Sequence, residues 1–117
     1  MPRGVVNDTV QLALGNAVYA SALRDMLLRA GACEVECVDS PDLNRQGVMV
    51  LDCERLERLP QPFAFPERVV LIARDDPSSR SRAWEAGVTS VVYDKDPLAT
   101  AVLAVMAARL RVRKSRE

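Results

Sequence analysis

The sequence contains no histidine among its 117 residues. This absence excludes the catalytic triads of serine and cysteine hydrolases, metal sites with histidine ligands, and mechanisms that use a histidine base. The sequence also lacks any apolar run close to the ~18–20 residues that a membrane-spanning helix needs. Its first residues, Met-Pro-Arg-Gly, do not form a signal-peptide pattern. We therefore expect a soluble cytoplasmic protein that does not contact a membrane.

Cysteine is scarce, with three residues and no Cys-x-x-Cys pair. Cys33 and Cys37 fall within one expected strand, where four residues span ~13 Å at ~3.3 Å per residue. A disulfide needs Cα atoms within ~7 Å, so these two cannot bridge each other there. We expect them and Cys53 to be buried free thiols, because free cysteine usually behaves as a small apolar residue.

An excess of one charge is missing as well, since 16 basic residues balance 16 acidic ones. With 49% hydrophobic residues, this composition favours one globular domain over a disordered chain. The charges are nevertheless uneven, because five of the last nine residues are basic. We divide the chain into a domain over residues 1–112 and a basic tail over 113–117. A solvated helix end explains this tail, and contact with nucleic acid or anionic lipid is the alternative.

The apolar pattern alternates between the periods of strands and helices. Short apolar or alternating runs predict five strands, at residues 9–14, 33–38, 48–51, 69–73 and 89–93. Helical spacing and capping residues predict helices over 17–30, 55–59, 79–86 and 98–112. The nine residues between the second and third strands, 39–47, leave little room for a helix. This alternation implies a parallel sheet covered on both faces, with its functional crevice at the carboxyl ends of the strands.

Three stretches, residues 48–52, 83–88 and 91–97, follow patterns that occur together in one family. Residues 48–52 resemble the family's third strand with its terminal phospho-acceptor aspartate, and residues 83–88 resemble its Ala-x-x-Ala-Gly-Ala segment. Residues 91–97 resemble its fifth strand with its lysine. The family is the receiver domain of bacterial two-component response regulators, and the resemblance covers essentially the whole chain. It implies an α/β, flavodoxin-like, doubly wound fold. The five-stranded parallel sheet would have the order 2-1-3-4-5, with shortened second and third helices.

Receivers form an aspartyl phosphate with the help of a divalent cation and a lysine. The resemblance identifies Asp52 with the phospho-acceptor and Lys95 with the phosphate-contacting lysine, although Lys95 comes one residue late. The acidic pair that holds the cation aligns with Leu14 and Gly15, which cannot supply the oxygen ligands of a hard cation. The switch hydroxyl aligns with Ala73. We therefore interpret the chain as a degenerate receiver, or pseudo-receiver, without catalytic residues, a metal site or a cofactor.

Three functions remain open at this point. The first is a non-enzymatic signalling module that acts through contact with a signalling protein or a histidine kinase. The second is a phosphorylatable, Mg²⁺-dependent receiver that uses Asp52 in a phosphorelay. Such a receiver would reach nucleic acid only through a DNA-binding output domain that is absent here. The third is a small α/β nucleotide-binding domain, although the sequence has neither Gly-x-Gly-x-x-Gly nor Gly-x-x-x-x-Gly-Lys.

Several single side chains have a structural interpretation beside a functional one. Asp52 can cap the turn that follows its strand, and Asp75 and Asp76 can cap the next helix. Trp84, the only tryptophan, is expected to pack on its helix rather than contact a partner. Lys95 either forms a salt bridge with Asp52 across the crevice or lies solvated in its loop.

The C-terminal helix has two apolar flanks. One flank suits the sheet, and it contains Leu98, Ala101, Val102, Val105 and Val112. The second lies roughly 80–140° away and contains Ala99, Leu103, Met106 and Leu110. Receivers commonly dimerise or bind partners through this region, so we predict a partner interface at Leu103, Met106 and Leu110, with a homodimer as one form. The alternative is a broad buried arc within a monomer.

Overall fold

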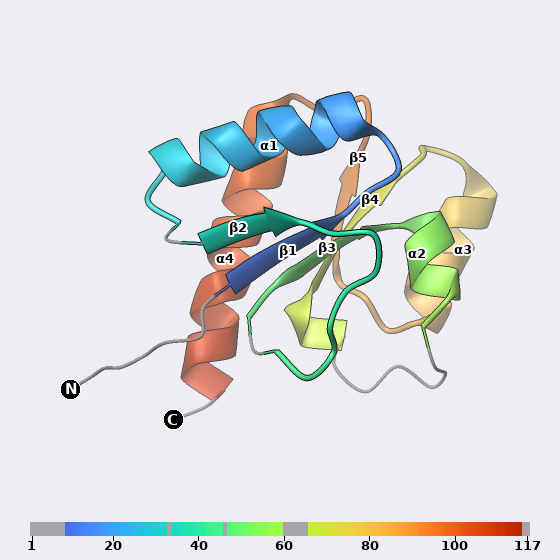
Figure 1. Ribbon diagram of the computed structural model, residues 1–117. Coiled ribbons are helices and arrows are strands. Elements are labelled where there is room, and N and C mark those ends of the chain that lie inside the picture. Colours follow the sequence, from blue (N-terminus) through green and yellow to red (C-terminus); the bar gives the residue numbers. More distant parts are fainter. Residues whose placement is uncertain (1–8, 33, 46, 60–65, 116–117) are drawn as a thin grey trace.

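Five parallel strands form one sheet in the computed structural model, which describes residues 9–32, 34–45, 47–59 and 66–115 (Figure 1). The strands are β1 (Thr9–Ala13), β2 (Glu34–Cys37), β3 (Met49–Asp52), β4 (Val69–Ala73) and β5 (Ser90–Tyr93). The helices are α1 (Ala17–Arg29), α2 (Cys53–Glu57), α3 (Pro77–Glu85) and α4 (Leu98–Ser115), with a short 3-10 helix η1 (Pro66–Arg68). The order β2-β1-β3-β4-β5 confirms the predicted flavodoxin-like topology.

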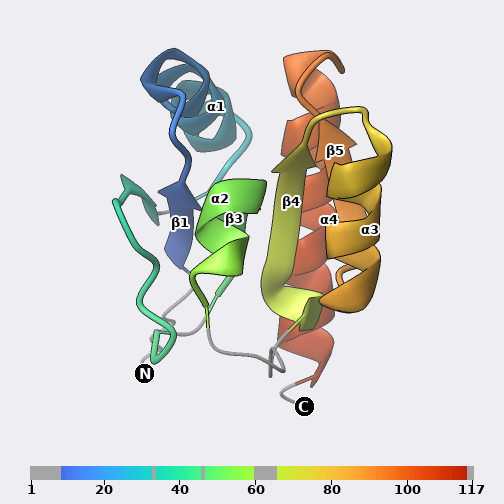
Figure 2. The same ribbon diagram turned by 90° about the vertical axis from the view of Figure 1, so that its right-hand side faces the viewer.

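The sheet lies between two layers of helices (Figure 2). α1 and α4 cover one face, where Leu23 and Val105 pack against alternate residues of the strands. α2 and α3 cover the other face, where Leu56 and Ala83 pack against the remaining strand residues. β4 is buried along its whole length, as expected of a central parallel strand. None of the helices in the described ranges is long and apolar enough to cross a membrane.

A polar loop, residues 38–48, connects β2 to β3. No helix occurs in the described residues of this loop, so the prediction of a shortened second helix is wrong. The buried side chain of Gln11 anchors the loop, because it donates to Asp42 O (3.1 Å) and accepts from Asp42 N (2.7 Å). These two bonds compensate the cost of burying an amide. The helix that the resemblance counts as the third is α2 here, and it is short as predicted, with five residues.

The end of this loop passes very close to β1 at Gly47. Gly47 has a φ of +115°, and a Cβ added to it would lie 2.2 Å from Thr9 O. The buried guanidinium of Arg68 closes the corner, donating from Nε to Gly47 O (2.9 Å) and from Nη2 to Arg45 O. Burial lowers the pKa of Arg68. Polar side chains from β1 and η1 therefore fix the loop. A short helix was expected at this place.

Aspartate caps determine where two helices begin. The side chains of Asp52 and Asp76 accept hydrogen bonds from the backbone N–H groups of residues 55 and 79. α2 and α3 therefore each begin two residues earlier than the sequence predicts. The predicted capping roles of these two aspartates are confirmed. Asp75, also predicted as a cap, forms a salt bridge with Arg80 (3.1 Å) instead.

The last helix, α4, is longer than predicted. It begins at Leu98, directly after Pro97, whose carbonyl oxygen accepts a hydrogen bond from Thr100 N. It continues to Ser115, three residues past the predicted end, because arginine and lysine favour helices and their charges complement the dipole at a helix C-terminus. The predicted boundary between domain and tail at 112–113 lies inside this helix.

Two predictions of burial are wrong. Trp84 is 85% exposed on α3 and does not pack into the core. Cys37 is a free, exposed thiol, since β2 is an edge strand, and Cys53 is free and half-buried. Cys33 lies outside the described residues. The apolar character of Trp84 and Cys37 was therefore not sufficient to predict that they are buried.

Replacing Gly47 by alanine is expected to destabilise the fold more than the same change at Gly31. Gly31 also has a positive φ (+105°), but a Cβ there has no neighbour within 4 Å. Gly31→Ala therefore carries only the backbone strain, about 1–3 kcal/mol. Gly47→Ala adds an overlap with the Thr9 backbone, worth about another 1–3 kcal/mol. Urea unfolding measures both losses, and equal losses would contradict the close approach.

Asp76 is expected to contribute to the pH dependence of stability. Hydrogen bonds from the backbone and hydroxyl of Ser79 lower the pKa of Asp76 from its ordinary value of 3.8. A lowered pKa in the folded state stabilises the protein above the ordinary value, and this contribution is lost as the pH falls through the folded pKa. Asp76→Asn keeps a capping oxygen but cannot titrate.

Urea unfolding at neutral pH and at about pH 3 tests this sign. The stability difference between wild type and Asp76→Asn should shrink in acid. A second variant, Asp76→Ala, removes the cap and should be less stable than Asp76→Asn at both pH values. A difference between wild type and Asp76→Asn that stays constant with pH would show that the carboxylate charge has no part in the cap.

Candidate functional site

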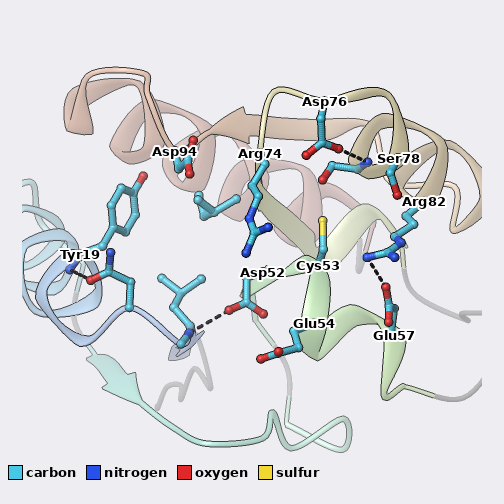
Figure 3. Close-up of a pocket in the computed structure, with 15 residues that line it drawn as sticks. Tyr19, Asp52, Cys53, Glu54, Glu57, Arg74, Asp76, Ser78, Arg82 and Asp94 are labelled. Carbon is cyan, nitrogen blue, oxygen red and sulfur yellow. Dashed lines mark hydrogen bonds and ion pairs between the residues drawn. The ribbon is translucent and has the colours of Figure 1, made fainter.

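A cleft lies at the carboxyl ends of the strands, where the sequence predicted the functional crevice (Figure 3). Because all five strands are parallel, the segments that follow them meet at one edge of the sheet. The loop after β1 contributes Gly15, and the end of β3 contributes Asp52. Arg74 follows β4, and Asp94 follows β5. Charged groups from different parts of the sequence are thus brought together.

Asp52 is the centre of this cleft, with a side chain that is 26% exposed. Its Oδ1 accepts from the backbone N–H of Arg55 (2.9 Å) and caps α2. Its Oδ2 accepts from the backbone N–H of Gly15 (2.8 Å) and lies 3.3 Å from Arg55 Nη1. Both oxygens of the carboxylate therefore have donors from the protein itself.

Arg55 brings three carboxylates together around one guanidinium. Besides Asp52, its Nη1 lies 3.1 Å from Glu54 Oε1, and its Nη2 lies 3.7 Å from Asp39 Oδ1. The side chain is only 13% exposed, so this cation is partly shielded from water. Sequence reasoning missed Arg55. The spacing of three residues from a capping aspartate is the signal that could have identified it.

The guanidinium also fills the space beside Gly15. A Cβ added to Gly15 would lie 2.9 Å from Arg55 Nη1 and 3.3 Å from Asp52 Oδ2. Gly15 does not have a positive φ, so its backbone would accept a side chain. A side chain at this position would require the flexible end of Arg55 to shift. By the resemblance, residues 14 and 15 align with the acidic pair of receivers, and a cationic group of the protein stands beside them here.

Lys95 is exposed and is not among the residues that line the cleft. Its neighbour Asp94 lines it instead, fixed by a hydrogen bond from its N–H to Ala73 O (2.9 Å). Within the described residues, the salt bridge of Asp52 is formed with Arg55 and not with Lys95. By the resemblance, the lysine position of the family falls on Asp94, one residue before Lys95. A phosphate-contacting role of Lys95 stays a prediction.

The end of β4 supplies a cation in place of a hydroxyl. Ala73, aligned with the switch serine or threonine, is buried and offers only a methyl group. The next residue, Arg74, points toward Asp52 in Figure 3. It forms no salt bridge with any residue that the structure describes. This guanidinium can attract an anion or a carboxylate, but it does not replace the hydroxyl as a neutral hydrogen-bond partner.

Tyr19 closes the cleft on the α1 side. Its hydroxyl is buried and has no hydrogen-bond partner within the described part of the chain. Burial raises the pKa of Tyr19, and the charges of Asp96 and Asp94 raise it further. The phenol therefore stays protonated at neutral pH. It cannot serve as a base in this cleft.

The cleft is rich in charge without a metal-binding arrangement. The charged residues that line it are Asp52, Glu54, Glu57, Asp76 and Asp94 on the acidic side, with Arg74 and Arg82 on the basic side. Arg82 forms a salt bridge with Glu57, and Asp76 caps α3. In the part of the chain that the structure describes, no three histidine, cysteine or acidic side chains are grouped to hold a metal ion. The carboxylates are committed to caps and salt bridges or stand apart.

The predicted interface on α4 lies on a different surface. Leu103 and Leu110 are 71% and 64% exposed, so they do not belong to a broad buried arc. Met106 is half-buried and packs against the core. The opposite side of the helix, with Ala101 and Val105, is fully buried against the sheet. α4 therefore presents an apolar stripe to solvent.

Comparisons with known proteins identify the fold. A scan against protein-family models found no match, and a search of curated proteins found none. Among solved structures, FixJ-N superposes with a TM-score of 0.62 at 18% sequence identity, covering 91% of this chain and 96% of that chain. The signal receiver domain of a modulated diguanylate cyclase from Desulfovibrio desulfuricans G20 gives a TM-score of 0.61 at 16% identity, covering 92% and 97%. At these identities the likeness establishes the fold, and the chain has the flavodoxin-like fold of receiver domains.

Proposed function

We propose that this chain is a receiver-like signalling domain that acts through protein contacts, with a guanidinium in place of the divalent cation. One observation carries the proposal. Arg55 lies against Asp52 Oδ2 and occupies the space that a side chain at Gly15 would need. The fold supports a receiver-like role, since FixJ-N and a receiver domain of a diguanylate cyclase share it.

The charges in the cleft explain why Mg²⁺ would not be needed. Mg²⁺ prefers six oxygen ligands in an octahedron at about 2.0–2.1 Å. Beside Asp52, the groups present are an N–H from Gly15 and the guanidinium of Arg55, which are both donors. A divalent cation at Asp52 Oδ2 would be repelled by the guanidinium of Arg55, which lies 3.3 Å from that oxygen. Arg55 thus places a positive charge beside Asp52 without any ion from solution, and it shares that charge with Glu54 and Asp39.

The same arrangement disfavours phosphoryl transfer to Asp52. Both oxygens of its carboxylate accept hydrogen bonds, which makes them poorer nucleophiles. The transferred group would meet monovalent arginines in place of a divalent cation, and positioned cations contribute a factor of about 10³–10⁵ in such reactions. If the charge at Asp52 does not change, the domain signals through the proteins that bind it. The partner would be a signalling protein or a histidine kinase, and the exposed face of α4 is the proposed contact.

The alternative is a receiver that is still phosphorylated on Asp52. It is favoured by one observation, namely that Asp52 remains 26% exposed in an open cleft with Arg74 directed toward it. In that case the domain would belong to a phosphorelay and would depend on Mg²⁺. A nucleotide-binding domain would instead be stabilised by nucleotides in a thermal-shift assay.

Incubation with Mg²⁺ and beryllofluoride, and separately with acetyl phosphate, distinguishes these functions. We expect no saturable shift of the backbone amides of Gly15 and Arg55 in NMR spectra and no phosphoryl adduct in the intact mass. The physical reason is that both oxygens of Asp52 already accept hydrogen bonds and that a guanidinium lies against Oδ2. An adduct that forms in the wild type and disappears in Asp52→Ala would establish the phosphorylatable alternative and overturn the proposal.

Removing Arg55 while restoring acidic side chains should create a cation site. The variant Leu14→Asp/Gly15→Asp/Arg55→Ala places carboxylates beside Asp52 and empties the space that the guanidinium fills. We expect it to bind Mg²⁺ at least roughly tenfold more tightly than the wild type, because three carboxylates supply the oxygen ligands that Mg²⁺ prefers. Calorimetric titration measures the affinities.

Arg55→Ala alone is the matched control for this variant. It removes the guanidinium but adds no ligand, so its Mg²⁺ affinity should lie well below that of the triple variant. Circular dichroism verifies that each variant is folded. A wild type that binds Mg²⁺ as tightly as the triple variant would show that Arg55 does not stand in for the cation.

A further inference from the structure

Two opposite charges at the carboxyl edge of the sheet lie on neighbouring strands without pairing. The register of β4 and β5 ends with Ala73 beside Tyr93, and a hydrogen bond from Asp94 N to Ala73 O (2.9 Å) continues the ladder. The next residue of each strand is charged, Arg74 after β4 and Asp94 after β5. Opposite charges on neighbouring strands attract each other. Among the described residues, however, neither side chain forms a salt bridge, with the other or with a third residue.

These two side chains diverge on one face of the sheet. Side chains alternate between the two faces along a strand. Two residues before this pair, Ile72 and Val92 pack in the core beside α1 and α4, so the charged pair belongs to the same face. In Figure 3 the guanidinium of Arg74 is directed toward Asp52 and not toward Asp94. Arg74 and Asp94 are exposed and line one cleft, so a positive and a negative group stand apart there, each open to a partner from solution.

A buried hydroxyl lies on the same side of the cleft. The phenol oxygen of Tyr19 is directed toward Asp94 in Figure 3, and it has no hydrogen-bond partner in the part of the chain that the structure describes. A buried polar group without a partner costs free energy, and a phenol can either donate or accept a hydrogen bond. Leu14 and Ile72 line the same cleft and pack on the core, so they add apolar surface beside these polar groups.

This combination favours a small zwitterion over an ion of one charge. An anion would pair with Arg74 and be repelled by Asp94, and a cation would have the opposite difficulty. The other charged groups that line the cleft are engaged in salt bridges or in a helix cap. An α-amino acid carries a carboxylate and an ammonium on one carbon atom, so it can meet both charges at once. An apolar side chain on that carbon would contact Leu14 and Ile72.

We propose that this part of the cleft binds an α-amino acid with an apolar side chain. Arg74 donates to its carboxylate, and Asp94 and the hydroxyl of Tyr19 accept from its ammonium. This goes beyond the proposed function, because it involves neither a phosphoryl group nor a metal and does not use Asp52 or Arg55. The two proposals fail independently. A phosphoryl adduct on Asp52 would leave the amino-acid site intact, and a failure to bind amino acids would leave the receiver-like role intact.

Titration of the isotope-labelled protein with L-leucine, followed by NMR, tests the proposal. The backbone amides of Tyr19, Arg74 and Asp94 should shift and saturate, in a buffer without Mg²⁺ or a phosphoryl donor. Two matched probes each lack one charge of L-leucine: isocaproate has no ammonium, and isopentylamine has no carboxylate. L-leucine should bind at least roughly tenfold more tightly than either probe, because each probe loses a charge-assisted hydrogen bond.

Two variants locate the site. Arg74→Gln and Asp94→Asn each remove one charge and keep a polar side chain. Each should weaken the binding of L-leucine at least roughly tenfold, since one charged contact is lost. Arg80→Gln and Asp25→Asn are the matched controls, because both residues are exposed and neither lines the cleft. These controls should leave the affinity unchanged.

Tyr19→Phe separates a binding role from a structural one. The hydroxyl has no partner within the described residues, so its removal should not lower the urea midpoint of the ligand-free protein. The same change should weaken the binding of L-leucine severalfold, because the ammonium loses an acceptor. A lower urea midpoint with unchanged affinity would show that the hydroxyl serves the fold and not the ligand.

The comparison of probes decides the question on the wild type alone, even if a variant fails to fold by circular dichroism. Isocaproate or isopentylamine that binds as tightly as L-leucine would reveal a site for a single charge and overturn the proposal. A lack of saturable shifts up to the solubility limit of L-leucine would overturn it as well. So would an affinity that is unchanged in folded Arg74→Gln and Asp94→Asn.

Discussion

The carboxylate of Asp52 joins three segments that the sequence keeps apart. Its Oδ2 accepts a hydrogen bond from the backbone N–H of Gly15, after β1, and its Oδ1 accepts one from the backbone N–H of Arg55, which caps α2. Oδ2 also pairs with the guanidinium of Arg55, and this guanidinium pairs with Asp39, after β2. A carboxylate in a partly shielded cleft needs a compensating cation. A guanidinium on the chain itself is present whenever the protein is folded. One compensating cation for Asp52 is thus built into the fold.

The β2–β3 loop also contributes to the surroundings of Arg55. A helix between these strands would have carried its own backbone hydrogen bonds, whereas the loop depends on buried side chains, above all Gln11 and Arg68. Gln11 fixes the loop at Asp42, only three residues after Asp39. The side chain of Asp39 is 93% exposed, and its Oδ1 lies 3.7 Å from Arg55 Nη2. The loop thus meets the arginine beside Asp52 through an exposed ion pair, which is a weak kind of interaction.

Much of the fold could be predicted from the sequence, and most of the site could not. β4 matches its predicted range completely, because a central parallel strand is buried on both faces and reads as an uninterrupted apolar run. Asp52 was found for the same reason, since it ends such a strand. Arg55 was missed because its role depends on Gly15, 40 positions earlier, and on the sheet order that brings the two loops together. Trp84 was misplaced because its helix is too polar for periodicity to define a buried face.

The cleft and the face of α4 are connected by a single loop. Asp94 lines the cleft, and α4 begins at Leu98, four residues later. In a switch, a change of charge at Asp52 would reach α4 through this loop. Under the proposed function, Arg55 holds that charge constant, so the loop has no change to transmit and α4 presents the same apolar stripe at all times. Under that proposal, binding of a partner to the stripe would follow mass action alone, so the concentrations of this protein and its partner, rather than a modification of Asp52, would set the amount of complex.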